Sequence, residues 1–272
     1  MKFVGLRMQA LTVIVLSLLT GDFVQAKDLT IAEQEEQLQP ERMIYRPNLP
    51  FDAIATADDI TSLYYNPAGL GIHPNQIGYF YGHNKADNLQ DHTVFLNAFG
   101  LAGSGQVRLG PGETTARRFS LGYSFINTDL FRLGSSYSWF SSNTDLFQEY
   151  QQWDIGLMLR PMRYISLGAV ARGVNNPSYQ GEQLDPRWDL GASLRPLPFA
   201  TERLTLSVDT TWDPSDDPNT AVASLTPRYS IELVPFLGTT LYGGWDRTNE
   251  AFFGAKFTSA MGQFSAQGNA PE

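Results

Sequence analysis

Two stretches of this sequence nearly repeat each other: residues 153–161 are WDIGLMLRP and residues 188–196 are WDLGASLRP. In both, apolar residues alternate with polar or small ones. A period of two places successive side chains on opposite faces of a β-strand, so each stretch predicts a strand with one apolar and one polar face. Each is followed by a turn and a second alternating stretch, and the repeated unit is therefore a β-hairpin.

The same alternation recurs from Gln76 onwards and predicts about twelve antiparallel strands. Ten or fourteen are the alternatives, because the ends of short alternating stretches are fixed only to within a few residues. Several of the strands have about ten residues, the length that a tilted strand needs to cross a bilayer. The expected strands are 76–83, 92–99, 103–109, 117–126, 130–141, 151–160, 164–174, 187–195, 203–212, 222–234, 236–246 and 250–259.

The connections between these strands alternate between short and long. Short links occur near residues 127–129, 161–163, 196–202 and 235, and longer polar links lie near 141–150, 175–186 and 213–220. Short turns on one rim and long loops on the other are typical of outer-membrane barrels, and an even strand count would return both chain ends to the periplasmic side. The pattern therefore favours an all-β fold, an antiparallel up-and-down transmembrane β-barrel.

The tryptophans support the membrane interpretation. All five fall at or near the ends of expected strands, as an interfacial aromatic girdle requires: Trp139, Trp153, Trp188, Trp212 and Trp245. Alternation alone cannot separate a membrane barrel from a soluble β-sandwich, since the apolar face could equally be a core. A soluble periplasmic β-protein therefore stays as an alternative.

The first 26 residues have the features of a secretory signal peptide. Lys2 and Arg7 precede an apolar run at 10–19, and residues 24–26 (VQA) form a cleavage-like site. An uncleaved anchor is the alternative, but the run is shorter than the about 20 residues of a spanning helix. The expected organisation is a signal peptide at 1–26, an N-terminal leader and luminal segment at 27–75, a barrel at 76–259 and a tail at 260–272.

Composition excludes several classes of function. A net charge of −9 makes the chain a poor nucleic-acid binder, and the absence of cysteine removes disulfides and thiolate chemistry. No GxSxG elbow, P-loop or HExxH motif is present. His73, His83 and His92 flank the first expected strand, where convergence on a metal is not expected. We predict a non-enzymatic protein without cofactor, and the acidic loop at 213–217 is better explained by solvation than by Ca²⁺ binding.

The segment at 55–71, ATADDITSLYYNPAGLG, resembles the N-terminal signature of the long-chain fatty-acid transporter superfamily of outer-membrane barrels, which includes the shuttle barrels of type IX secretion. The resemblance implies that this segment folds into the barrel lumen as a hatch. A surface turn leading into the first strand is the alternative. The hatch or ligand residues that it implies are Asp58, Asp59, Tyr64, Tyr65, Asn66, Pro67, Ala68, Gly69 and Leu70.

A second resemblance concerns the hairpin at 153–177. It looks like barrels fused ahead of signal-peptide-peptidase-type serine proteases, which implies a membrane-anchor module for a periplasmic protease-type assembly. The chain has about 200 residues after position 71, fewer than the fatty-acid transporters, and a narrow blocked lumen leaves less room for a long acyl chain.

Isolated charges on the polar faces are expected to line the lumen. Asp154 and Asp189 lie on strands next to that of Arg172, and an unpaired charge in a narrow lumen is costly, so we expect ion pairs there. A selectivity lining for a channel is the alternative. The expected luminal polar residues are Arg132, Asp154, Arg160, Arg172, Asp189, Arg195, Asp209 and Lys256.

Together these features predict a barrel in the outer membrane of a Gram-negative bacterium. It would bind or pass a small hydrophobic molecule, or dock a protein partner. Its other expected contacts are outer-membrane lipid or lipopolysaccharide, and no nucleic acid.

Overall fold

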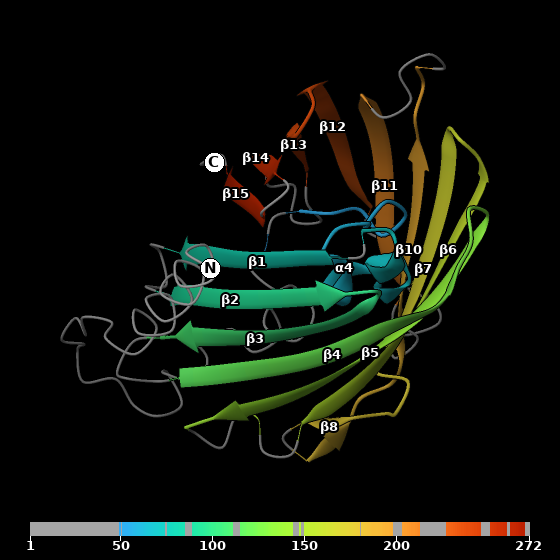
Figure 1. The fold of residues 1–272 in the computed structure, drawn as a ribbon. Helices are drawn as coiled ribbons and strands as arrows, with labels where there is room; N and C mark the ends of the chain where they lie inside the picture. The colour runs from blue at the N-terminus through green and yellow to red at the C-terminus, as the bar shows by residue number, and fades with distance from the viewer. Residues whose placement is uncertain are drawn as a thin grey trace, which may run out of the picture.

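A computed structural model of the chain describes Leu49 and residues 51–73, 75–84, 89–110, 115–143, 147, 150–179, 181–197, 203–212, 227–245, 251–259 and 262–269. The expected signal peptide at 1–26 and the acidic loop at 213–217 lie outside these residues. Two short helices come first, α4 (Ser62–Tyr65) and the 3-10 helix η1 (Pro67–Gly71). Strands make up the rest of the regular structure, and the curved sheet surrounds α4 (Figure 1).

Thirteen strands among the described residues form one closed barrel. A two-stranded sheet of β8 (Ser178–Tyr179) and β9 (Glu182–Gln183) stands in the long loop between β7 and β10. The barrel strands are β1 (Asn75–Asn84), β2 (Leu89–Ala98), β3 (Leu101–Leu109), β4 (Thr115–Asn127), β5 (Phe131–Ser142), β6 (Gln151–Met162), β7 (Ile165–Arg172), β10 (Arg187–Leu194), β11 (Leu204–Trp212), β12 (Arg228–Phe236), β13 (Thr239–Trp245), β14 (Ala251–Ser259) and β15 (Gly262–Asn269).

Each strand pairs with its neighbour in the chain in antiparallel fashion, which confirms the all-β, up-and-down barrel. Strands β1 to β7 and β10 to β14 correspond in order to the twelve expected strands. The ends differ by a few residues, and residues 222–226 of the tenth expected strand lie outside the described part. Alternation located the strands because one face of each is consistently buried.

The end of the chain differs from the expectation. Residues 262–269, expected to belong to a tail, form β15, which pairs antiparallel with β14 along its whole length. β15 then closes the barrel through a parallel pairing with β1, at Gly78 and Gln263. With an odd number of described strands, β15 runs towards the long-loop rim, so the described chain does not end on the rim where β1 begins.

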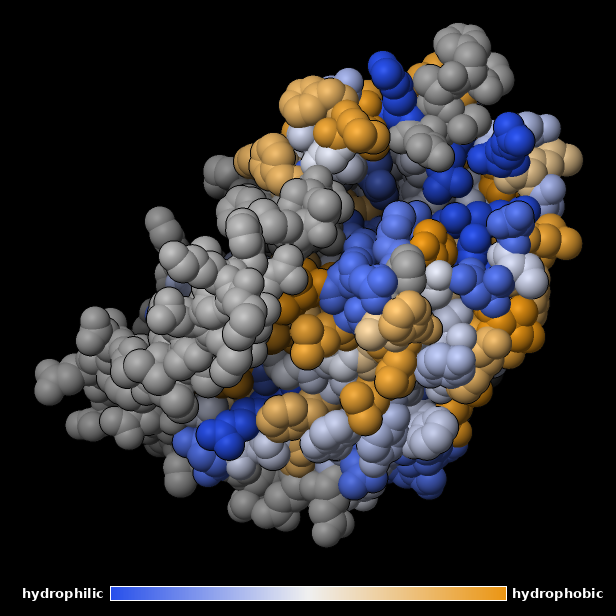
Figure 2. Space-filling view, viewed as in Figure 1, coloured by the Kyte–Doolittle hydropathy of each residue, from blue (hydrophilic) through white to orange (hydrophobic). Residues whose placement is uncertain are grey.

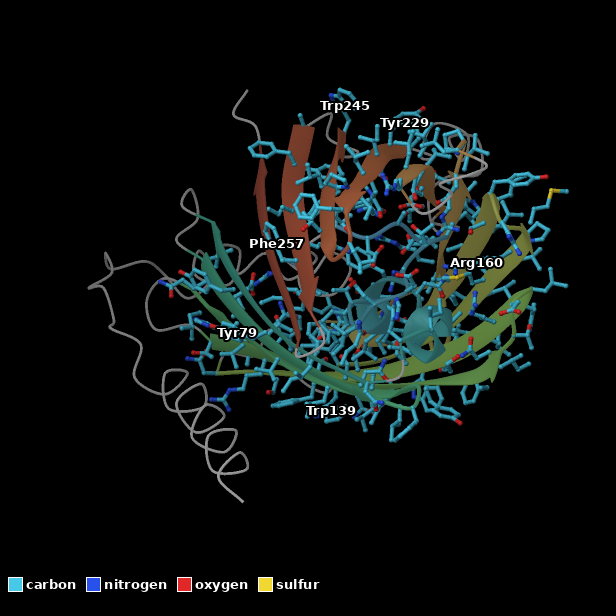
Figure 3. The ribbon with its side chains drawn as sticks, turned by 45° about the horizontal axis from the view of Figure 1, so that its top comes forward. Tyr79, Trp139, Arg160, Tyr229, Trp245 and Phe257 are labelled. Atoms are coloured by element: carbon cyan, nitrogen blue, oxygen red, sulfur yellow. The ribbon has the colours of Figure 1, made fainter. Side chains whose placement is uncertain are left out.

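The outer face of the barrel is apolar on nearly every strand. Exposed side chains alternate with buried ones, and the exposed set includes Tyr79, Leu96, Leu121, Ile155, Leu167, Leu190, Leu206, Ile231, Leu241 and Phe253. Figure 2 shows such side chains along the right-hand outer edge, and Figure 3 shows Trp139, Tyr229 and Trp245 pointing away from the wall. None of the described helices is long and apolar enough to cross a membrane.

The tryptophans lie near one rim of the barrel, at one edge of this apolar outer face. Trp188 pairs with Trp212, and Tyr229 with Trp245, at the ends of strands that lead into the long loops. Trp153 and Tyr137 are neighbours at the same end. All five tryptophans of the chain thus lie towards the long-loop rim, and the short-turn rim has other exposed aromatic residues, such as Phe99 and Phe236.

Two clusters of buried, mainly apolar side chains occupy different parts of the interior. Residues of the N-terminal segment pack against the wall in a cluster that includes Ile60, Leu63, Leu70, Phe80 and Phe95. Towards the long loops, an aromatic cluster contains Leu89, Ala116, Phe140, Phe147 and Tyr150, with Tyr179 and Leu184 packed against it.

Candidate functional site

The N-terminal segment at 51–73, called the hatch below, lies inside the barrel. Its backbone turns at residues 53–57, forms α4 and then η1, and leads into β1. The side chains of Ala53, Ala55, Ala57, Ile60, Thr61, Ser62, Asn66, Ala68 and Leu70 are almost completely inaccessible to solvent. Such burial excludes the surface turn that was the alternative for this segment.

Asn66 separates the two helices of the hatch. Its extended backbone ends α4, and Pro67 then starts η1, since proline lacks an N–H and suits the first helical position. The Asn66 side-chain amide donates to the carbonyls of Ile54 (2.8 Å) and Leu157 (3.0 Å), and its oxygen accepts from the N–H of Ala68 (3.2 Å). One buried side chain therefore fastens the hatch both to itself and to β6.

Arg172 on β7 holds the end of α4. Its guanidinium donates to the carbonyls of Tyr64 (2.9 Å) and Tyr65 (3.0 Å), which have no partner within the helix. The same group pairs with Asp154 at 3.3 Å and with Asp189. The expected ion pairs of Arg172 are confirmed, and they orient a cation that contacts the hatch.

Lys256 on β14 holds the opposite side of the hatch. Its ammonium lies 3.5 Å from Asp52 and 3.3 Å from Asp59. The Thr61 hydroxyl lies within hydrogen-bonding distance of both carboxylates. Burial raises the pKa of the Asp52 carboxyl well above its usual value, although Lys256 acts in the opposite direction.

Asp209 on β11 anchors the first turn of the hatch. Its carboxylate accepts from the N–H of Ile54 (3.2 Å) and pairs with Arg228 (3.0 Å). Arg228 in turn lies 4.3 Å from the centre of the Phe51 ring, a cation–π contact. The N–H of Phe51 donates to the side-chain oxygen of Gln267 on β15 (2.8 Å).

The two tyrosines of the hatch occupy different surroundings. Tyr64 stacks under the guanidinium of Arg118 at 4.0 Å and shares a hydrogen bond with Ser104 (2.7 Å). Burial raises the pKa of the Tyr65 hydroxyl to about 12, so it stays protonated and donates to the carbonyl of Leu49 (3.4 Å).

A row of glycines on the inner wall receives the hatch. These residues occupy neighbouring strands from β4 to β10, and a Cβ on any of them would collide with hatch atoms or with the side chain that holds them. At Gly134 it would lie 2.3 Å from the Pro67 carbonyl oxygen, and at Gly156 2.2 Å from Asn66 Oδ1. The row consists of Gly122, Gly134, Gly156, Gly168 and Gly191.

Sequence reasoning missed this row and several polar contacts. Asn97 donates to the carbonyls of Leu70 (2.9 Å) and His73 (3.0 Å), and Asn127 donates to the carbonyl of Gly71 (2.6 Å). The sequence does contain a signal for this row. Each of its glycines occupies an inward-facing strand position and comes directly after Leu or Ile.

The remaining residues that the sequence placed in the site lie in the hatch or near the short-turn end of the lumen. Gly69 is packed so closely against the Ala57 carbonyl that no side chain fits there. Asp58 lies 3.7 Å from Arg160, near the short-turn end of the lumen. At this end Arg132 is buried, and Arg195 donates to the buried Ser166 hydroxyl. His92 lies apart from this region and bonds to the Tyr79 hydroxyl (2.8 Å). Within the described ranges, no group of three metal-ligating side chains was found.

The fold and the site define a closed β-barrel whose lumen holds the N-terminal hatch. No family model matches the chain, and no curated protein matches its sequence. Among solved structures, it is similar to the KdgM porin in complex with disordered oligogalacturonate, at 10% identity and a TM-score of 0.37. That match covers 71% of this chain and 95% of the other, and a likeness this weak carries no argument about function.

Proposed function

We propose that this chain is an outer-membrane β-barrel that is closed at rest by its hatch. It binds a small hydrophobic molecule in its lumen and passes it when the hatch is displaced. The observation that carries the proposal is the apolar outer face, which runs around the barrel and alternates with a buried polar face.

Such a surface suits lipid rather than water. Exposed apolar patches larger than a few hundred Å² are rare on soluble monomers. In a bilayer the same surface is required, and a closed barrel satisfies the backbone hydrogen bonds that lipid cannot. The tryptophans at one rim fit an interface with lipid headgroups or lipopolysaccharide.

The hatch contacts support a closed resting state. Side chains from β2, β3, β4, β7, β11, β14 and β15 bond to it, so it blocks the lumen from several sides. The resemblance of residues 55–71 to the hatch of fatty-acid transporters points the same way. The aromatic cluster around Phe140, Phe147 and Tyr150 supports an apolar ligand on the long-loop side.

The membrane part is tested by migration on gels and by solubility. A folded barrel needs detergent to stay in solution and migrates differently when boiled. If the chain is soluble without detergent and migrates identically before and after boiling, the membrane assignment is wrong. Cleavage after Ala26 in the exported protein would test the signal peptide.

The hatch part is tested by thiol labelling, since the chain has no cysteine. We expect the thiol of Ala68→Cys to resist labelling in the folded barrel. Adding Gly156→Ala should make this thiol reactive, because the new methyl group displaces Asn66. Gly105→Ala is the matched control, because a Cβ there meets only the Phe119 ring at 3.7 Å. Equal labelling in the two double variants would contradict a hatch seated on the glycine row.

A further inference from the structure

Three arginines face the lumen together at its short-turn end. Arg132 lies on β5, Arg160 on β6, and Arg195 directly follows β10. These strands and the intervening β7 are consecutive in the barrel, and neighbouring strands lie about 4.8 Å apart. Arg160 (labelled in Figure 3) stands between the other two and is acted on electrostatically by both.

Several buried donor nitrogens of Arg132 and Arg160 have no hydrogen-bond partner. Arg132 donates from Nε to Asn127 (2.8 Å), and Arg195 donates to the Ser166 hydroxyl (3.4 Å). Arg132 Nη1 and both Nε and Nη2 of Arg160 are buried without a hydrogen-bond partner. Arg132 as a residue is more than nine-tenths buried, and its unpartnered Nη1 is shielded from bulk solvent.

Among the described residues, the carboxylates near these arginines lie beyond hydrogen-bonding distance of them. Asp58 of the hatch lies 3.7 Å from Arg160, beyond hydrogen-bonding distance. Asp129 acts on Arg132 from an exposed turn, and Glu232 acts on Arg195 from β12. Elsewhere in the described lumen, Arg172 is paired with two aspartates and Arg108 with Asp91.

We propose that Arg132, Arg160 and Arg195 form a binding site for one carboxylate or phosphate group. Guanidinium groups present N–H donors in a planar fork that fits such oxyanions, and charge-assisted hydrogen bonds are the strong ones. Asp58 is about one-third exposed, so an anion can approach from the short-turn end and compete with it for Arg160. The site deepens the proposed function by giving the luminal ligand an anionic group.

The test is calorimetric titration of the full chain in a neutral detergent with inorganic phosphate, octyl phosphate and octanol. We expect binding of the phosphates and none of octanol. Binding of inorganic phosphate identifies a site for free anions, whereas binding of octyl phosphate alone identifies a site for anionic headgroups. Arg160→Gln should weaken binding about tenfold or more, and Arg163→Gln, an exposed arginine on the same rim, should not.

A second variant separates loss of binding from loss of folding. Asp58→Asn removes the competing carboxylate and should tighten phosphate binding roughly fivefold, a gain that a misfolded protein cannot produce. Boiled and unboiled gel migration confirms the barrel in each variant. The site is refuted if a folded barrel binds neither phosphate, or binds it equally in Arg160→Gln and Arg163→Gln; failure of the barrel itself would instead appear on the gel.

Discussion

At the scale of single residues, Arg172 joins the hatch to two other strands. It contacts Asp154 on β6, Asp189 on β10 and two carbonyls of α4. Asp189 is also bonded to the Thr211 hydroxyl, so one network links four neighbouring strands. A cation at the end of a helix is also favoured by the helix dipole.

Replacing Arg172 by Met should lower the free energy of unfolding by about 3–5 kcal/mol, because two buried carboxylates lose their cation. The measurement is the denaturant concentration at which the heat-modifiable form is lost. Arg163→Met, in the exposed turn after β6, is the control and should change stability little. Equal stability of the two variants would show that Arg172 does not hold the barrel and hatch together.

Asp52 should make stability depend on pH. Its folded pKa is raised by burial, so the protonated carboxyl is favoured in the folded state. The stabilisation is therefore complete below the unfolded value near 4 and is lost as pH rises through the folded pKa. The amide in Asp52→Asn stays neutral at every pH. The free energy of unfolding of this variant, relative to that of the parent, should therefore rise as pH increases from the unfolded to the folded pKa of Asp52. Asp129→Asn, at an exposed turn, should show no such trend, and a flat difference for Asp52→Asn would contradict the expectation.

At the scale of elements, β15 closes the barrel. Its antiparallel pairing covers β14 from Phe252 to Ser259, whereas its parallel pairing with β1 is limited to one register pair. Without β15, the edges of β14 and β1 would both be unpaired, and an open edge is not tolerated in lipid. Gln267 on the same strand also bonds to the hatch.

Ending the chain after Met261 should therefore abolish the heat-modifiable form, since it leaves two strand edges open and removes Gln267. Ending it after Asn269 removes three residues and should leave migration unchanged. The gel comparison of the two truncations checks this, and a folded barrel from the shorter chain would show that β15 is dispensable.

Alternation predicted the twelve other strands because burial of one face repeats every second residue. It missed β15 because residues 262–269 (GQFSAQGN) have few large apolar side chains. Their place in the sheet comes from closure, which pairs strands nearly 190 positions apart in the sequence. A contact of that range leaves no local pattern to detect.

At the scale of the whole molecule, the hatch and the barrel complement each other. The wall supplies glycines where the hatch backbone lies close, and charges where its carbonyls and N–H groups need partners. A lumen filled in this way should conduct ions poorly.

Deleting residues 51–72 should turn a nearly silent barrel into a conducting one in planar bilayers, because the removed segment fills the lumen at the level of the glycine row. The full chain is the reference, and both proteins must show heat-modifiable migration. Equal conductance of the two would contradict a lumen closed by the hatch.

The sequence by itself determined the class of fold, twelve of the strands and the faces they present, since these follow from a local period of two. It also marked 55–71 as unusual and predicted the ion pairs of Arg172, whose partners lie on adjacent strands. Only the tertiary structure decided the closure by β15, the seating of the hatch on the glycine row, and the gathering of Arg132, Arg160 and Arg195. These depend on distances across the lumen, which are set by barrel curvature and by contacts between distant segments rather than by neighbouring residues.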